Sequence, residues 1–218
     1  MPRSFIDHLV VTAPSLETGA AYVRNTLGVA PQTGGEHARM GTHNLLLRLG
    51  DALYLEVIAA NPHAPAPARP RWFALDTMDQ DAAAALTSWV ARTPDIQASA
   101  AACSERLGSI EPMSRGALDW RITIPADGLP PLDGLAPALI EWQTEAHPAA
   151  RLADHGLSLL RFELFHAEPQ RVSRLLSSLA LEGPIAVASL PAGRAPYLVA
   201  HIDTPQGLRL LTVHHAAN

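Results

Sequence analysis

The sequence contains no lysine, because all 16 of its positively charged residues are arginine. A chain without lysine cannot form a Schiff base, anchor pyridoxal phosphate or build the phosphate-binding loop of P-loop nucleotide-binding proteins. The net charge of −5 argues against the basic surface that nucleic-acid binding needs. Neither Gly-x-Gly-x-x-Gly nor Gly-x-Ser-x-Gly occurs, which argues against dinucleotide binding and against a serine hydrolase.

Cysteine and long apolar runs are scarce as well. Cys103 stands alone, so the chain has no internal disulfide. No uninterrupted run of about 18 apolar residues is present, and the N-terminus lacks the apolar segment of a signal peptide. The apolar content of 48% is ample for a packed core. We therefore expect a soluble cytoplasmic protein without membrane or nucleic-acid partners.

What the sequence does contain is a repeated order of predicted elements: a strand, a helix and three more strands. The first copy has strand 5–12, a helix from 16 to 27 with Ser15 as its cap and Gly28 as its end, and strands 36–42, 44–49 and 53–59. The second copy has strand 88–92, a helix from 96 to 107 ended by Gly108, and strands 110–114, 118–124 and 138–142. The third, looser copy has strand 159–166, a helix from about 169 to 181, and strands 185–190, 197–202 and 208–213.

The repeat predicts an α+β fold in which βαβββ modules form curved, mostly antiparallel sheets around a small-molecule cavity. The first module spans residues 1–60 and the second spans residues 84–146. The spacer between them, residues 61–83, begins with the proline- and alanine-rich stretch 61–70 and is expected to be extended. The third module, residues 157–218, is expected to be structural.

Two polar side chains interrupt the apolar strands of the first module. Along residues 5–12, Ile6, His8, Val10 and Thr12 alternate with Leu9 and Val11, which are the expected partners of the helix. His8 therefore belongs to the free face that can line a cavity. Glu56 lies in the middle of an otherwise apolar strand, where an unpaired charge would be costly.

Glu141 interrupts the last strand of the second module in a similar way. An ion pair with Arg48, Arg92 or Arg121 would explain each glutamate taken alone. The recurrence of a glutamate in two final strands, together with His8, instead favours a shared site.

Several motifs resemble the glyoxalase-like branch of the vicinal oxygen chelate superfamily, which also includes bleomycin-resistance proteins and extradiol dioxygenases. They span nearly the whole chain in order: Ile-Asp-His-Leu-Val-Val at 6–11, Gly-Thr-His-Asn at 41–44, Tyr-Leu-Glu-Val-Ile at 54–58, Met-Ser-Arg at 113–115, Asp-Trp-Arg at 119–121, Leu-Ile-Glu-Trp at 139–142 and His-Pro at 147–148.

The resemblance implies paired βαβββ modules and, in metal-dependent members, a divalent ion bound by the first and last strands of two modules. Carried over to this chain, the ligands are His8, Glu56 and Glu141, and the fourth position falls at or near Ser88, which is a poor ligand. One histidine with two carboxylates suits Zn²⁺, Mn²⁺, Fe²⁺ or Ni²⁺. Glu56 and Glu141 are also the candidates for the general base.

Four further residues are candidates for substrate binding: His43, Asn44, Arg115 and Arg121. The arginines can hold a carboxylate or phosphate through paired hydrogen bonds, although pairing with Asp119 or Glu111 is an equal alternative. His37 lies in a glycine-rich loop that could cover the cavity. His147 could act in the site or simply cap the chain turn.

These observations favour a metal-dependent lyase or isomerase that binds a small molecule through two adjacent oxygens. An extradiol dioxygenase is less favoured, since it needs two histidines on the metal and His8 alone is well placed. The alternative function is metal-free binding or sequestration of a small molecule. An odd number of modules leaves an open sheet edge, which predicts a homodimer.

Overall fold

The computed structural model describes residues 2–144 and 146–213. The first part of the chain contains β1 (Ser4–Thr12), α1 (Leu16–Leu27), β2 (Gln32–His37), β3 (Thr42–Gly50) and β4 (Leu53–Ala60). The second part contains β5 (Ala85–Arg92), α2 (Ile96–Ala102), β6 (Ser109–Arg115), β7 (Leu118–Ile124) and β8 (Ala138–Trp142). The last part contains β9 (Ser158–His166), α3 (Pro169–Ser178), β10 (Leu181–Glu182), β11 (Ile185–Ser189), β12 (Tyr197–Asp203) and β13 (Arg209–Thr212).

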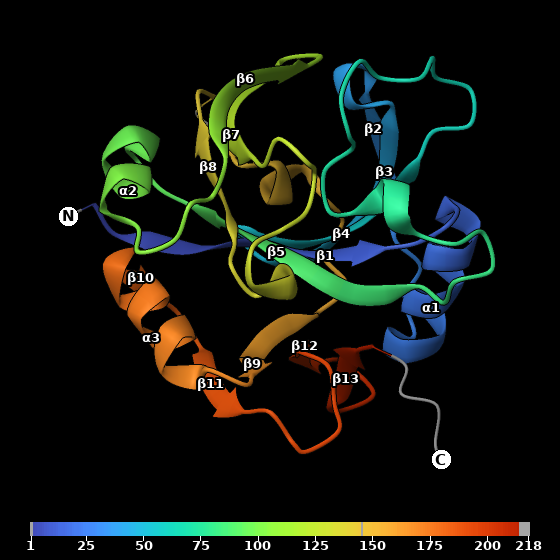
Figure 1. Cartoon of the computed structure of the whole chain (residues 1–218). Coiled ribbons are helices and arrows are strands. Elements are labelled where there is room, and N and C mark those ends of the chain that lie inside the picture. Colours follow the sequence, from blue (N-terminus) through green and yellow to red (C-terminus); the bar gives the residue numbers. More distant parts are fainter. Residues whose placement is uncertain (1, 145, 214–218) are drawn as a thin grey trace.

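The larger sheet is a curled half-barrel built around β1 and β5. Its strand order is β2-β3-β4-β1-β5-β8-β7-β6, and the short strand β10 pairs with the start of β1. The two halves meet where β1 and β5 run antiparallel. In Figure 1 the β2–β3 arm and the β6–β7 arm rise on opposite sides of this seam. The curled sheet with few helices confirms the predicted α+β fold class.

The last part of the chain forms a separate sheet with the order β11-β9-β12-β13. Strands β9, β11, β12 and β13 lie near the predicted ranges, but β10 is an additional strand that joins the large sheet, and the pairing differs from that of the first part. In the last part, β11 follows α3 and pairs with β9 in parallel. In the first part, the strand that follows α1 is β2, which lies at the edge of the sheet and does not pair with β1. The hydroxyl of Tyr22 in α1 accepts a hydrogen bond from Thr212 N at 3.1 Å and donates one to Thr212 O, which ties this sheet to the first helix.

Alternation along β1 separates two hydrophobic cores on the two faces of the large sheet. Leu9 and Val11 pack with the helices and the second sheet, whereas Val10 faces the concave side. This agrees with the predicted faces except at Ile6, which packs with Leu9. The pairing of β1 with β5 slips between Ile6 and His8, and such a bulge moves one residue to the opposite face.

Local sequence signals explain most helix ends. Ser15 accepts a hydrogen bond from Thr18 N at the start of α1, and Gly28 ends that helix with a left-handed φ of 78°. Helix α2 is shorter than the predicted range 96–107 and ends at Ala102. The next residues turn away because Ser104 N donates to Ser178 Oγ of α3 at 3.0 Å.

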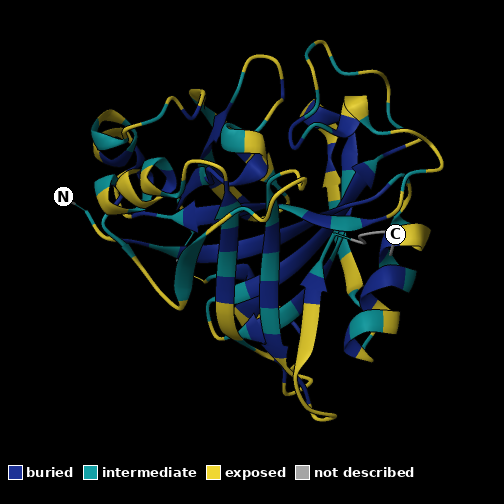
Figure 2. Cartoon of the chain, turned by 60° about the horizontal axis from the view of Figure 1, so that its bottom comes forward, coloured by how far each residue is buried: buried dark blue, intermediate teal, exposed yellow. Residues whose placement is uncertain are grey.

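Burial follows this arrangement. Figure 2 shows buried residues running through the crossing strands, while exposed residues lie on the loops, on the outer sides of the helices and on parts of some strands. No helix in the described part of the chain has both the length and the apolar character needed to cross a membrane.

Candidate active site

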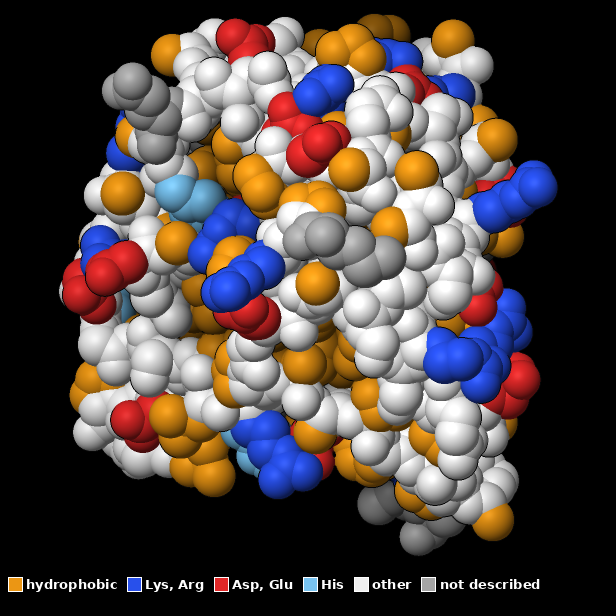
Figure 3. Space-filling model, turned by 90° about the vertical axis from the view of Figure 1, so that its left-hand side faces the viewer, with side chains coloured by type: hydrophobic (Ala, Val, Ile, Leu, Met, Phe, Trp, Pro, Cys, Tyr) orange, Lys and Arg blue, Asp and Glu red, His pale blue; other side chains and the backbone are white. Residues whose placement is uncertain are grey.

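The concave side of the large sheet holds a small pocket, and the empty space in and in front of it, open solvent included, is about 370 Å³. Its polar lining consists of His8, His37, Asn44, Tyr54, Glu56 and Arg115. Its aromatic walls are Trp72, Phe73, Trp120 and Trp142. Both arms of the sheet and the segment between β4 and β5 contribute, so the pocket exists only when the two halves are paired. Figure 3 shows one face of the molecule where hydrophobic side chains floor a hollow with charged and histidine side chains at its rim.

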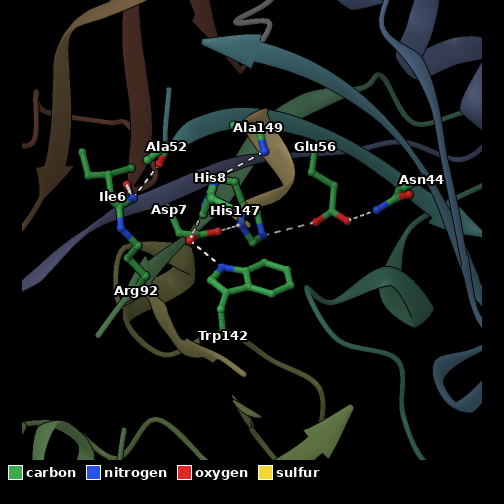
Figure 4. A network of polar contacts seen from close by, with 10 residues as sticks. All are labelled: Ile6, Asp7, His8, Asn44, Ala52, Glu56, Arg92, Trp142, His147 and Ala149. Carbon is green, nitrogen blue, oxygen red and sulfur yellow. Dashed lines mark hydrogen bonds and ion pairs between the residues drawn. The ribbon is translucent and has the colours of Figure 1, made fainter. Parts of the chain in front are cut away.

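His8 is held from behind by a buried carboxylate. Asp7 Oδ1 accepts a hydrogen bond from His8 Nδ1 at 2.6 Å, and Asp7 Oδ2 accepts bonds from Trp142 Nε1 and His147 Nε2, both at 2.9 Å. His147 Nδ1 in turn accepts a bond from Ala149 N. Figure 4 shows this network converging on Asp7. The network links the start of β1 to the chain that follows β8.

This network keeps Asp7 ionised and sets the tautomer of His8. Burial by itself would raise the pKa of Asp7, but the hydrogen bonds from His147 and His8 outweigh burial and hold the pKa well below its usual value. With the Nδ1 proton shared with Asp7, His8 presents Nε2 to the pocket, 3.5 Å from Glu56 Oε2. The ring of Tyr54 stacks on the imidazole at 4.5 Å. Burial raises the pKa of Tyr54 well above its usual value, so its phenol is neutral.

Glu56 is 5% exposed and is stabilised by polar partners rather than by an arginine. Asn44 Nδ2 donates to Glu56 Oε1 at 2.5 Å. The amide oxygen of Asn44 accepts bonds from Gly35 N at 2.8 Å and from Arg115 Nη1 at 3.1 Å. Asn44 therefore connects the carboxylate of Glu56 to the guanidinium of Arg115.

Arg115, at the end of β6, reaches across the pocket to the opposite arm. Its Nη1 also donates to His37 Nε2 at 3.2 Å. Burial, followed by the charge of Arg115, lowers the pKa of His37 to about 3. His37 is therefore a neutral acceptor, and its Nδ1 lies 3.1 Å from Thr42 Oγ1. Among the described residues that line the pocket, one guanidinium (Arg115) and one carboxylate (Glu56) are joined through neutral groups.

The structure brings together four of the predicted site residues: His8, Asn44, Glu56 and Arg115. His43 alternates with Asn44 on β3 and does not line the pocket.

Glu141 and Arg121 lie outside the pocket and pair with each other at 2.5 Å. Glu141 Oε2 also accepts a bond from Ile96 N at the start of α2. Burial would raise the pKa of Glu141, but the bonds from Arg121, Ile96 N and Gln143 hold it below its usual value. This arrangement is the ion-pair alternative given above.

Strand register explains why Glu56 and Glu141 face opposite sides. Glu56 pairs with Val10 on β1, whereas Val90, which lies 80 residues after Val10, pairs with Ala138 on β8. The position equivalent to Glu56 is therefore Ala138. Glu141 lies three residues further, and this odd offset turns its side chain toward α2.

The predicted ligands therefore do not fit a single metal ion. His8 Nε2 and Glu56 Oε2 converge, but Glu141 binds elsewhere and Ser88 lies outside this pocket. Within residues 2–144 and 146–213, no three histidine, cysteine or acidic side chains are arranged to hold a metal. Binding of a divalent metal ion therefore remains a prediction, and the arrangement of the predicted ligands does not support it.

Several pocket residues carried weak sequence signals. Asp7 belongs to the Ile-Asp-His motif, and an acidic residue beside a histidine in an apolar strand is a detectable signal. His147 both caps the turn and binds Asp7, so it combines the two predicted alternatives. Trp72 and Phe73 lie in the segment predicted as a spacer, where nothing in the pattern indicated a pocket wall.

The chain combines a curled half-barrel sheet with a polar pocket on the concave side of that sheet. The chain belongs to the family of the glyoxalase-like domain, whose family description matches residues 6–180. This confirms the resemblance found in the sequence.

Similarity to solved structures is weak. A Streptomyces coelicolor methylmalonyl-CoA epimerase in complex with 2-nitronate-propionyl-CoA is 18% identical, with a TM-score of 0.43, over 66% of this chain and 97% of that chain. The methylmalonyl-CoA epimerase of Mycobacterium tuberculosis is 14% identical, with a TM-score of 0.39, over 63% and 85% of the two chains. A hypothetical protein of Bacillus halodurans is 11% identical, with a TM-score of 0.43, over 69% and 98%. No curated protein matches the chain.

Proposed function

We propose that this protein is an isomerase or lyase that moves a proton at a carbon next to a carbonyl group of a small molecule. The observation that carries the proposal is the convergence of His8 Nε2 and Glu56 Oε2 at 3.5 Å in a pocket that also contains Arg115. A carboxylate and an imidazole at this distance form a general acid–base pair.

Each residue has a defined task. Glu56 Oε2 removes the proton from the carbon, and the proton can then pass from Glu56 Oε2 to His8 Nε2. Asp7 fixes the orientation of the imidazole and stabilises it when it becomes protonated. The negative charge develops on the carbonyl oxygen of the resulting enolate, where a guanidinium stabilises it. The hydrogen bonds of Arg115 to His37 and Asn44, at the pocket wall, support the assignment of this role to Arg115.

The outcome depends on where the proton returns. Return to the opposite face of the carbon gives an epimer, and return to a neighbouring atom gives an isomer. Loss of a group from the next carbon, without return, gives a lyase reaction. None of these steps is routed through a metal ion, since the predicted ligand set does not converge.

The test is exchange of carbon-bound protons with solvent, followed by proton NMR in D₂O. The substrates are a panel of 2-oxo acids and 2-hydroxy ketones, whose acidic protons lie next to a carbonyl. Glu56→Gln should slow exchange about 10²- to 10⁴-fold, the usual contribution of a general base. The matched control Glu17→Gln, at an exposed position of α1, should leave the rate unchanged. Equal rates for wild type and Glu56→Gln on every exchanging substrate would refute the proposal.

A binding or sequestration protein is the second candidate. The pairing of Glu141 with Arg121 favours it, because this pair removes one predicted catalytic carboxylate from the pocket. The aromatic walls formed by Trp120 and Trp142 would suit a bound planar ligand. Tight binding without proton exchange would establish this function instead.

We also propose that the protein is a homodimer. Three leucine side chains of the second sheet are each at least half exposed: Leu160 on β9, and Leu208 and Leu210 at β13. A second copy would cover them. Sedimentation of wild type as a dimer and of Leu210→Arg as a monomer is the expected result, and a monomeric wild type would exclude it.

A further inference from the structure

The segment between β4 and β5 forms part of the pocket wall. Trp72 and Phe73 are buried, and both line the polar pocket that contains His8 and Glu56. Trp72 meets the ring of His37 edge-on at 5.0 Å. These two aromatic residues also line a second pocket.

The second pocket is apolar, and the empty space in and in front of it, open solvent included, is about 360 Å³. Its lining includes Trp89, Leu107, Pro131, Pro137 and Ala138. It shares Trp72, Phe73 and Ile122 with the polar pocket, so the two are neighbours. A ligand that spans both would place a polar end at Arg115 and an apolar end among the prolines.

Trp72 lines both pockets, and its buried indole nitrogen has no hydrogen-bond partner among the described residues. A buried donor without an acceptor is unfavourable, and most native proteins avoid it. The indole N–H is a donor only. The group that satisfies it must therefore be an acceptor such as a carbonyl or carboxylate oxygen.

The backbone beside Trp72 is strained in the same place. Phe73 and Ala74 have φ values of 56° and 57°, in the left-handed region that residues other than glycine seldom adopt. Ala74 N donates to Gly128 O at 2.9 Å, which helps to hold this conformation. Strain of this kind gathers at ligand-binding segments.

We propose that Trp72 is a ligand-contact residue whose indole N–H donates a hydrogen bond to an oxygen of the bound molecule. The ligand class is a carbonyl compound or carboxylate that carries a hydrocarbon substituent, with the oxygens in the polar pocket and the hydrocarbon in the apolar one. The inference deepens the proposed function, because it names the substrate class of the same pocket.

The experiment uses the full chain with ¹⁵N-labelled tryptophan and two ligands, pyruvate and 2-oxooctanoate. The Trp72→Phe variant assigns the indole signal of Trp72. On binding of 2-oxooctanoate, this signal should move downfield, and calorimetry should give the longer acid an affinity gain of about fourfold for each buried methylene.

Trp72→Phe retains an aromatic side chain at the pocket wall, although a smaller one, and removes the N–H donor. It should weaken binding of 2-oxooctanoate by about three- to tenfold, the usual effect of one hydrogen bond. Glu17→Gln is the control, because Glu17 is exposed on α1 and lines neither pocket. That variant should bind as wild type does, and circular dichroism melting verifies that both variants are folded.

Three results would overturn the inference: no binding of either acid, a Trp72 signal that does not move on binding, or equal affinities for wild type and Trp72→Phe. Failure of the proposed function gives a different pattern. In that case 2-oxooctanoate binds and moves the Trp72 signal, while its protons do not exchange with solvent.

Discussion

The neutral state of His37 predicts how stability changes with pH. Burial and the neighbouring Arg115 lower the pKa of His37 to about 3 from the ordinary value of 6.5. Because the folded-state pKa is the lower one, the stability that depends on neutral His37 is complete above about pH 6.5. It is lost as the pH falls from about 6.5 toward 3, since the unfolded chain takes up the proton first. Between pH 7 and pH 5 the loss amounts to about 2 kcal/mol.

The assay is urea denaturation at pH 7, 6 and 5 for wild type and for His37→Gln, which retains an acceptor for Arg115 but does not titrate. The stability difference between the two should change by about 2 kcal/mol across this range, because only wild type has a titrating group at position 37. His155→Gln, at an exposed position, should follow wild type. Parallel stability curves for wild type and His37→Gln would refute the reasoning.

Three further predictions concern the network, a turn and the glutamate outside the pocket. Asp7→Asn places an amide among three donors and should cost about 3 kcal/mol in urea denaturation, with no loss if the network is unimportant. Gly108→Ala should destabilise the fold strongly, because Gly108 has a φ of 97° and a Cβ there would lie 2.2 Å from the Ile124 carbonyl carbon. Gly116→Ala is the control, since Gly116 has open space around it, and it should cost only about 1 kcal/mol in thermal melting. Glu141→Gln should lower the melting temperature but leave the rate of proton exchange unchanged. A slower exchange would show that Glu141 takes part in the reaction.

The first strand shows how far sequence alone reaches. Alternation placed His8 and Val10 on one face and Leu9 on the other, and the structure agrees because local alternation fixes the direction of a side chain. Ile6 escaped this rule, since the bulge beside it depends on pairing with β5. Pairing of that kind comes from residues about 80 positions away and leaves no local signal.

The site was predictable only in part for the same reason. Asp7 gains its partners from Trp142 and His147, more than 130 residues later in the chain. Glu141 looked equivalent to Glu56 as a glutamate in a final strand, but the strand register decides which face each one occupies. Trp72 lies in a proline-rich connection whose path across the pocket has no periodicity to read.

The pairing of β1 with β10 has a consequence for the order in which the molecule can form during synthesis. Ser4 pairs with Leu181, so the start of β1 cannot pair with β10 until nearly the whole chain has been made. At about 5–20 residues per second, this delay is roughly 10–35 s. During that time the end of β1 next to the catalytic candidates is an open edge that can pair with another chain. Fragments that stop before residue 181 retain this edge permanently.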